Sequence, residues 1–451
     1  MSLSTVPVKT PLKMRLHNEE RAIYLPAISE SWARMVHIGK PIAGLNITAA
    51  DLNFLDPTNR LFRYSYALYS AGQHNTAAAV KDDIVSKRDR NETIVLGDSG
   101  GFQVQTTAGY FTPERVLNNM RWMEAVSDYS MILDFPTGGI ASGNMAPHVA
   151  RLIEVGWDLQ SLNDTNRLGV DYNACLVQTK LNNNAFQKNH APGATKFLNV
   201  LQGRSEAESR HWYDAVKHYP FTGWAFAGHH QNRFSLILAR LIDMREDGLL
   251  GQVEWLHVLG ISTLEIGVLL TATLRAVRRY NPTFQISFDT ASPFLLAANQ
   301  RLLAGATFDK EGWSTQAIAP SSYGANRNGD NLGDLLVEEM EGKGTSRHRI
   351  VSRTALSRLL TLGNLRKPDN LMSNDGYMMA THHNIEALAD AHDLAHQRMF
   401  DDPIIRDPAA TPLSIKTVAV MIDQIMDMST AEARSKIAEW KPYLDVLRSN
   451  V

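Results

Sequence analysis

The sequence of 451 residues predicts an α/β protein built on a closed (β/α)8 barrel, a TIM barrel, with insertions and a helical C-terminal extension. The first observation behind this prediction is a series of short apolar runs that end in a polar residue or in glycine. The second is that amphipathic stretches, with apolar residues three and four positions apart, separate these runs. Continuous apolar strands alternating with helices are typical of a helix-covered parallel sheet, and the number of repeats favours closure into a barrel.

The strand-like runs are 94–98, 129–134, 197–203, 223–228, 255–260 and 284–289, and the helix-like stretches are 113–126, 207–217, 232–245 and 263–279. An open doubly wound sheet is the main competitor, but no Gly-x-Gly-x-x-Gly turn follows an early strand and no Walker phosphate loop occurs. Segments 182–193 and 323–333, rich in Asn and Gly, are expected to be loops. We expect a barrel domain at 20–400 with a basic insertion at about 341–370, then a helical tail at 401–451, in which 412–451 forms two short amphipathic helices.

The run at 94–98 leads into Gly-Asp-Ser-Gly-Gly-Phe-Gln-Val at 97–104, which is the most informative segment of the chain. It places a carboxylate at the end of a strand, followed by glycines that permit close approach of a ligand and by an aromatic ring that offers a stacking face. All strands of a barrel point their C-terminal ends at one mouth. The strand ends expected to converge there are Asp98, Asp134, Gln202, Gly228, Gly260 and Asp289.

In this order along the chain, from about Gly97 to Ser292, the motifs resemble those of the tRNA-guanine transglycosylases. Enzymes of this family are TIM barrels that cut the glycosidic bond of a guanine nucleotide and install a 7-deazaguanine. Asp-Ser-Gly-Gly-Phe-Gln is the most specific element, and His383-Asn384 is a weaker match.

The resemblance implies that Asp289 is the nucleophile that attacks C1′ of the sugar, and that Asp98 handles the proton of the leaving and incoming bases. It also implies a base-binding set made of Ser99, Phe102, Gln103, Asp134, Gln202, Gly203, Gly228, Leu259 and Gly260. In that set Asp134 accepts hydrogen bonds from N1 and N2 of a guanine edge. Gln202 and the backbone N–H of Gly228 bind O6, and the ring lies between Phe102 and Leu259.

The chain departs from the family at the zinc site, which in bacterial and eukaryotic tRNA enzymes is Cys-x-Cys-x-x-Cys with a distant His. Cys175 is the only cysteine here, so a zinc site of that type cannot form, and we expect no cofactor. His392 and His396 are spaced to share a helical face and are a lesser alternative for zinc, whereas a solvated polar helix face is the favoured interpretation.

The residues after Gly228 are His229-His230-Gln231-Asn232-Arg233, without the acid that the bacterial enzymes use near the aminomethyl group of the incoming base. This favours a base with a neutral substituent, such as 7-cyano-7-deazaguanine, with selectivity supplied by the pocket wall near His229 and His230. The surroundings of Asp289 are similar to those of the archaeal enzymes, but 412–451 gives no evidence of their RNA-binding module.

A chain without the zinc cysteines and without that module most resembles the DNA 7-deazaguanine transglycosylases of phages and bacterial genomic islands. This resemblance implies exchange of guanine in DNA for a 7-deazaguanine, which protects DNA from restriction. Two alternatives stay open, a tRNA-guanine transglycosylase with a degenerate zinc region and a noncatalytic subunit that positions nucleic acid.

The formal charge of −2 and the pI near 6.7 provide no global attraction to a polyanion, so a nucleic-acid face must be local. The candidate is the acid-free stretch 343–367, with Arg347, Arg349, Arg353 and Arg358 as phosphate contacts; the alternative is a solvated surface. DNA and a 7-deazaguanine base are the expected partners, with a homodimer and helper proteins left open. No secretory signal or membrane-spanning stretch is visible, and one cysteine agrees with a reducing compartment, so we expect the cytoplasm, that of the host for a phage protein.

Overall fold

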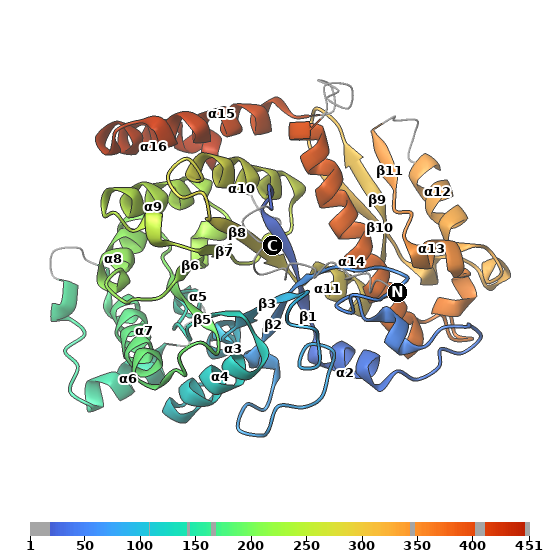
Figure 1. Cartoon of the computed structure of the whole chain (residues 1–451), viewed down its shortest axis with the longest axis horizontal. Coiled ribbons are helices and arrows are strands. Elements are labelled where there is room, and N and C mark those ends of the chain that lie inside the picture. The colour runs from blue at the N-terminus through green and yellow to red at the C-terminus, as the bar shows by residue number, and fades with distance from the viewer. Residues whose placement is uncertain are drawn as a thin grey trace, which may run out of the picture.

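The computed structural model describes residues 19–107, 109–141, 145–163, 168–342, 348–401 and 411–446. It confirms the predicted TIM barrel, because eight parallel strands pair in chain order and β8 pairs with β1 to close the ring (Figure 1). The barrel strands are β1 (Ile23–Ile28), β2 (Tyr66–Ser70), β3 (Ile94–Asp98), β4 (Tyr129–Met131), β5 (Lys196–Leu201), β6 (Gly223–Phe226), β7 (Trp255–Val258) and β8 (Gln285–Thr290).

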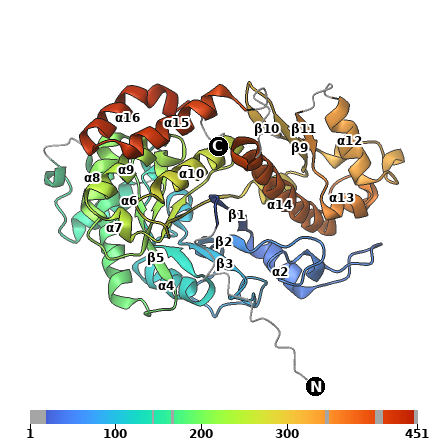
Figure 2. The ribbon, with the colours of Figure 1, turned by 45° about the horizontal axis from the view of Figure 1, so that its top comes forward.

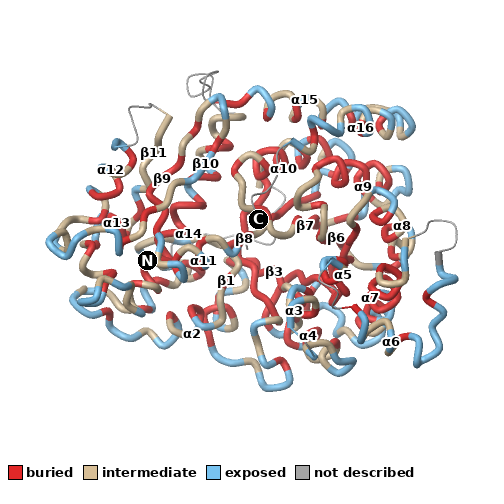
Figure 3. The backbone as a smooth tube through the Cα atoms, turned by 180° about the vertical axis from the view of Figure 1, so that it is seen from behind, coloured by how far each residue is buried: buried red, intermediate tan, exposed pale blue. Residues whose placement is uncertain are grey.

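Helices follow the strands and cover the outside of the barrel. They are α2 (Glu30–Ile38), α3 (Gly101–Thr106), α4 (Pro113–Val126), α5 (Gly138–Ala141), α6 (Ala146–Glu154), α7 (Val170–Asn189), α8 (Glu206–Val216), α9 (Phe234–Glu246), α10 (Leu264–Val277) and α11 (Ser292–Ala298). The backbone of the strands is buried almost throughout, whereas exposed segments lie on the outer faces of the helices and in loops (Figure 3). The inward and outward faces of the strands therefore both pack, as expected for a parallel barrel.

A second, smaller layer follows the barrel. Its sheet has the order β10-β9-β11 and is antiparallel, with β9 (Leu302–Phe308), β10 (Trp313–Ile318) and β11 (Arg349–Val351). The helices of this layer are α12 (Leu332–Gly342), α13 (Ala355–Leu359) and the long α14 (Asn374–His396). Helix α14 contacts β1, α10 and α11 of the barrel as well as β9, so it joins the two parts (Figure 1).

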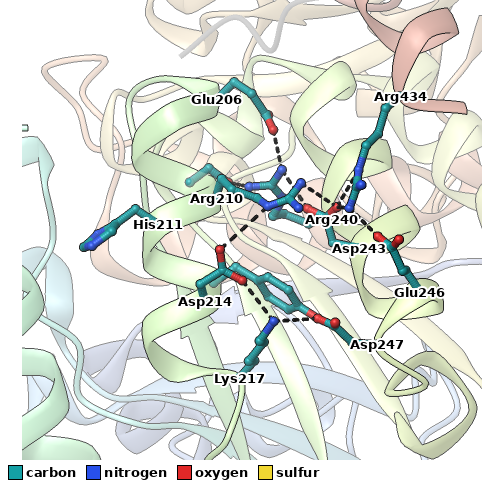
Figure 4. A network of polar contacts seen from close by, with 12 residues as sticks. Glu206, Arg210, His211, Asp214, Lys217, Arg240, Asp243, Glu246, Asp247 and Arg434 are labelled. Carbon is teal, nitrogen blue, oxygen red and sulfur yellow. Dashed lines mark hydrogen bonds and ion pairs between the residues drawn. The ribbon is translucent and has the colours of Figure 1, made fainter. Parts of the chain in front are cut away.

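The two helices predicted for the C-terminal tail are present as α15 (Leu413–Asp427) and α16 (Thr430–Leu444). They run across the barrel helices, α15 along α10 and α16 along α9 (Figure 2). Helix α16 is held by Arg434, which contacts the buried carboxylate of Asp243 on α9 at 2.7 Å, within the network of Figure 4. Asp445 after α16 accepts the backbone N–H and the hydroxyl of Ser235, both at 2.9 Å, and so caps the start of α9.

The expectation of a loop at 182–193 is wrong for 182–189, because α7 continues to Asn189, and is confirmed for 190–193. Asn182 is buried and its Nδ2 donates to the backbone oxygen of Leu133 at 2.7 Å, while Asn183 is buried against Asn199. Asparagine weakens an isolated helix because its side chain competes for backbone hydrogen bonds. Here those side chains have tertiary partners, which removes the competition.

Candidate functional site

Asp98 ends β3 beside Ser70, which ends β2, because the two strands pair in register at these residues. The Ser70 hydroxyl donates to Oδ2 of Asp98 at 2.5 Å, and the backbone N–H of Gly100 donates to Oδ1 at 3.2 Å. Burial raises the pKa of Asp98, the two hydrogen bonds lower it, and the charge of Asp289 raises it further. The net upward shift favours the protonated acid more than in an exposed aspartate.

Asp289 lies near the end of β8 and is anchored through one oxygen atom. Oδ1 accepts the backbone N–H of Gly260 at 2.9 Å and lies 3.1 Å from Nε2 of His257. Among the described residues no hydrogen-bond donor contacts Oδ2 of Asp289. The carboxylate therefore has one anchored oxygen and one oxygen without a hydrogen bond among these residues.

Asp134 follows β4 and is paired with Gln202 at the end of β5. The Gln202 amide Nε2 donates to Oδ2 of Asp134 at 2.7 Å, and the hydroxyl of Thr137 donates to Oε1 of Gln202 at 3.3 Å. Burial raises the pKa of Asp134 to about 7, against the effect of the Gln202 hydrogen bond and together with the charge of Asp98. Near neutral pH this carboxyl is present in both protonation states.

Two glycines allow the backbone to approach this pair. A Cβ atom added at Gly101 would lie 2.9 Å from Oδ1 of Asp134, and one at Gly228 would lie 2.8 Å from Oε1 of Gln202. Gly228 also has a φ of +60°, which disfavours any side chain. Asp134 and Gln202 are thus packed closely against bare backbone, which leaves no room for a side chain at either glycine.

The remaining predicted base-binding residues divide into two groups. Phe102 is 64% exposed at the start of α3, and Leu259 is partly buried after β7, so both have surface free for a ring. Ser99 is buried and its hydroxyl donates to the Ile132 backbone oxygen at 3.0 Å. Gln103 packs against Gly72, where a Cβ atom would lie 2.0 Å from its Oε1.

Gly203 and Gly260 also serve the architecture. A Cβ atom at Gly203 would lie 2.6 Å from the backbone N of Ser209. The backbone oxygen of Gly203 accepts the N–H of His229 at 3.2 Å. Gly203 therefore supports the turn that contains Gly228, and Gly260 holds Asp289.

The two histidines expected in the pocket wall differ. His230 is fully buried, with Nδ1 donating to the Ala227 oxygen at 2.6 Å and Nε2 contacting the Ser209 hydroxyl of α8 at 2.9 Å. Burial lowers the pKa of His230 to about 4, so the ring is neutral. Both ring nitrogens of His230 are thus engaged by protein groups, so neither is left for a ligand in the pocket wall predicted near His229 and His230. Nδ1 of His229 is buried and has no hydrogen-bond partner in the described part of the chain.

The favoured interpretation of His392 and His396 as a solvated helix face is wrong. Both are buried, 3% and 2% exposed, because α14 packs between the barrel and the second sheet. Nε2 of His396 contacts the Thr271 hydroxyl at 2.6 Å, and the His392 ring stacks on Tyr24. Within the described ranges, no group of three or more His, Cys, Asp or Glu side chains could hold a metal ion.

The predicted nucleic-acid contacts come from the second layer. Arg349 lies on β11 and donates to the backbone oxygen of Met340 at 3.3 Å, whereas Arg353 and Arg358 are exposed. Arg347 lies outside the described residues. Arg366 of the same basic stretch is buried and donates to the backbone oxygens of Pro320 and Tyr323, so it supports the loop there.

Sequence reasoning missed Ser70 and the group formed by Trp255, His257 and Ser287. These last three are fully buried, and their polar atoms form a chain that ends on Asp289. The sequence held a signal for this group, because alternate residues of a strand lie on the same face. Residues 255 and 257 share a face of one strand, residues 285, 287 and 289 share a face of another, and both faces carry polar atoms.

Fold and site together define an α/β-barrel protein with three interacting carboxyl groups at the C-terminal mouth of the barrel, where TIM-barrel enzymes hold their active sites. A scan against models of protein families and a search of curated proteins both find no match to this chain. Of the helices in the described ranges, none combines the length and the apolar character needed to span a bilayer.

Proposed function

We propose that the protein is a DNA-guanine transglycosylase, which exchanges guanine in DNA for a 7-deazaguanine through a covalent bond between Asp289 and the sugar. The observation that carries the proposal is that three carboxyl groups at the barrel mouth lie in three different environments. Asp289 has one free oxygen, Asp98 is biased toward the acid, and Asp134 faces a glutamine amide. Carboxyl groups in different environments can divide nucleophilic, acid–base and binding roles.

In the first half of the reaction, Oδ2 of Asp289 attacks C1′ of the target nucleotide and the C1′–N9 bond breaks. The electron pair of that bond leaves with guanine, and the proton of Asp98 neutralises the departing base. The upward shift of the Asp98 pKa favours the acid form that this step needs.

In the second half, Asp98 takes the N9 proton of the incoming base as N9 attacks C1′. The C1′–Oδ2 bond breaks and its electron pair restores the Asp289 carboxylate, so Asp98 is again an acid and no other reactant is needed. Asp134 and Gln202 bind the guanine-like edge that both bases share, because a carboxylate accepts from N1–H and the N2 amine, while an amide N–H donates to O6.

The choice of DNA over tRNA rests on the family resemblance of the sequence motifs. The one cysteine of the chain does not permit the zinc site that accompanies the tRNA enzymes. The target base must leave the duplex to reach the barrel mouth, at a cost of a few kcal/mol. The exposed ring of Phe102 and the edge contacts of Asp134 and Gln202 offer partial compensation.

The testing experiment incubates the full chain with radiolabelled guanine and, separately, with duplex DNA, single-stranded DNA and tRNA, and counts the label retained in each polymer. We expect label in DNA alone. Label in tRNA alone would indicate a tRNA enzyme with a variant zinc region, and label in no polymer would favour the noncatalytic subunit. Abasic sites without label would indicate simple hydrolysis.

Asp289→Asn provides the matched test of mechanism, with Asp423→Asn as the control, since Asp423 lies on α15 with its side chain 60% exposed. We expect Asp289→Asn to abolish incorporation and to retain base binding. We also expect the wild-type protein to form a complex with the DNA strand that resists denaturation, and Asp289→Asn to form none. Retained exchange in Asp289→Asn would remove Asp289 from the role of nucleophile.

A further inference from the structure

A buried chain of polar atoms runs along two adjacent barrel strands and ends on Asp289. Nε1 of Trp255 donates to Oγ of Ser287 at 2.6 Å, and Oγ of Ser287 lies 2.8 Å from Nδ1 of His257. Nε2 of His257 lies 3.1 Å from Oδ1 of Asp289. The side chains come only from the adjacent strands β7 and β8, in which His257 pairs with Ser287.

The direction of each hydrogen bond follows from the end of the chain at Trp255. An indole N–H can only donate, so it occupies a lone pair of the Ser287 hydroxyl. Among the described residues, Nδ1 of His257 is the only acceptor that the Ser287 hydroxyl contacts, so the hydroxyl proton is donated there. When Nδ1 accepts, the proton of the neutral imidazole lies on Nε2, and Nε2–H donates to Asp289.

We propose that Trp255 and Ser287 fix the tautomer of His257, and that His257 is a positioning residue which, together with Gly260, holds Oδ1 of Asp289 and leaves Oδ2 as the atom that attacks the sugar. This inference rests on the proposed function for the identity of the reaction, but the tautomer is a property of the protein alone. The opposite tautomer would set a ring lone pair against the carboxylate and release the nucleophile from one of its two anchors.

Burial makes the loss of any hydrogen bond in this chain costly. Trp255, His257 and Ser287 are all fully buried, so no water supplies a replacement partner from bulk solvent. A buried polar atom that loses its partner is costly, and an incorrect tautomer in a comparable buried His–Asp pair lowers the rate by orders of magnitude. The anchor on Oδ1 also matters in both halves of the reaction, because the same oxygen is held when the carboxylate is regenerated.

The first test reads the tautomer directly. Nitrogen NMR of protein labelled with ¹⁵N-histidine distinguishes the protonated from the unprotonated ring nitrogen, and His257→Gln identifies the His257 signals by their loss. We expect a neutral ring with the proton on Nε2 in the wild-type protein, and a change at His257 in Ser287→Ala. A proton on Nδ1, or on both nitrogens, would overturn the proposal even if the enzyme exchanges guanine.

The second test separates rate from binding. Ser287→Ala is expected to lower kcat for guanine exchange roughly ten- to a hundred-fold, as for partners that orient a metal-ligating histidine, with the KM for the base nearly unchanged. Trp255→Phe keeps an aromatic ring and removes the N–H, so a smaller loss in the same direction is expected. His257→Gln keeps an N–H donor and should retain more activity than His257→Leu.

The matched control is Ser130→Ala. Ser130 is also a fully buried strand serine with a hydrogen-bonded hydroxyl, but its partners are Ser127 and Thr195 rather than the chain that ends on Asp289. An equal loss of kcat in Ser130→Ala and Ser287→Ala, or a rise in KM alone for Ser287→Ala, would assign Ser287 a merely structural role. A wild-type protein that exchanges guanine in no polymer would instead contradict the proposed function and leave the NMR test standing.

Discussion

The amide Nε2 of Gln202 donates to Oδ2 of Asp134 at 2.7 Å, and this contact joins the ends of β4 and β5 at the barrel mouth. The pair presents an acceptor and an amide side by side, next to the bare backbone at Gly228. Burial nevertheless raises the pKa of Asp134 to about 7, so the acceptor is incompletely ionised at neutral pH. We therefore expect ligand binding at this edge to be coupled to the protonation of one carboxyl group.

Base affinity should rise with pH because of this coupling. Asp134 accepts two donors of a guanine edge only when ionised, and the ionised fraction grows as pH passes through about 7. Affinity scales with the competent fraction, so we expect the Kd of 7-cyano-7-deazaguanine to fall about tenfold from pH 6 to pH 8. Calorimetric titration across this range measures it. Asp134→Asn should bind more weakly with a flatter profile, and equal pH dependence in that variant would exclude Asp134 as the titrating group.

Ser70→Ala should move the pH dependence of exchange upward. The Ser70 hydroxyl bonds to Oδ2 of Asp98 and lowers the pKa of Asp98, so its removal raises that pKa further. The acid form that protonates the departing base then persists to higher pH, and we expect the descending limb of kcat to shift toward alkaline pH by up to about one unit. A profile of kcat from pH 5 to 9 tests this. Ser130→Ala should leave the profile in place, and a shift in both variants would contradict the assignment.

The barrel and the strand-end residues of the site were predictable because they depend on local pattern. Apolar runs ending in Asp98, Asp134, Gln202 and Asp289 are visible in the sequence, and closure of a parallel barrel brings such ends together. The assignment of roles to them came from a family resemblance, which stays a prediction.

His257 and Ser70 could not be assigned in the same way, because their roles depend on strand register. Ser70 acts on Asp98 only because β2 and β3 pair residue 70 with residue 98, and His257 meets Ser287 only through the register of β7 with β8. Such pairings are set by the tilt and stagger of the whole barrel. The burial of His392 and His396 depends likewise on the second layer that packs on α14, which no short pattern indicates.

The exposed arginines of the second layer should contribute to the salt dependence of DNA binding. Each phosphate contact contributes about 0.9 to the slope of log K against log salt, so Arg353→Gln with Arg358→Gln should flatten the slope by up to about two if both contact phosphates. Filter binding or fluorescence anisotropy between 50 and 200 mM salt, a span chosen from the same principle, gives the slope.

The control for this pair is Arg60→Gln with Arg63→Gln, two exposed arginines that precede β2 and so lie toward the end of the barrel opposite its mouth. The charge change is identical, and the slope should stay near that of the wild-type protein. An unchanged slope in the Arg353 and Arg358 variant would remove those residues from the DNA interface.

The buried carboxylate of Asp243 should be the most sensitive point in the attachment of the C-terminal helices. Its side chain is 2% exposed and contacts Arg210 at 2.8 Å, Arg240 at 2.8 Å and Arg434 at 2.7 Å (Figure 4). Arg240 is fully buried, so Asp243→Asn leaves a buried guanidinium with less compensation, and loss of one partner of a buried ion pair costs about 3–5 kcal/mol.

Urea denaturation should therefore show a large loss of stability in Asp243→Asn. Asp423→Asn removes an ion pair with Arg279 between side chains that are 60% and 39% exposed, and should cost less than about 1 kcal/mol because water screens that pair. Both variants change one aspartate on a helix at the contact between the tail and the barrel, so the comparison isolates burial. Since α16 is held through Arg434, limited proteolysis should also release the C-terminal helices sooner in Asp243→Asn than in Asp423→Asn. Equal stability of the two variants would mean that the exposed carboxylate of Glu206 compensates the charge of Arg240 without Asp243.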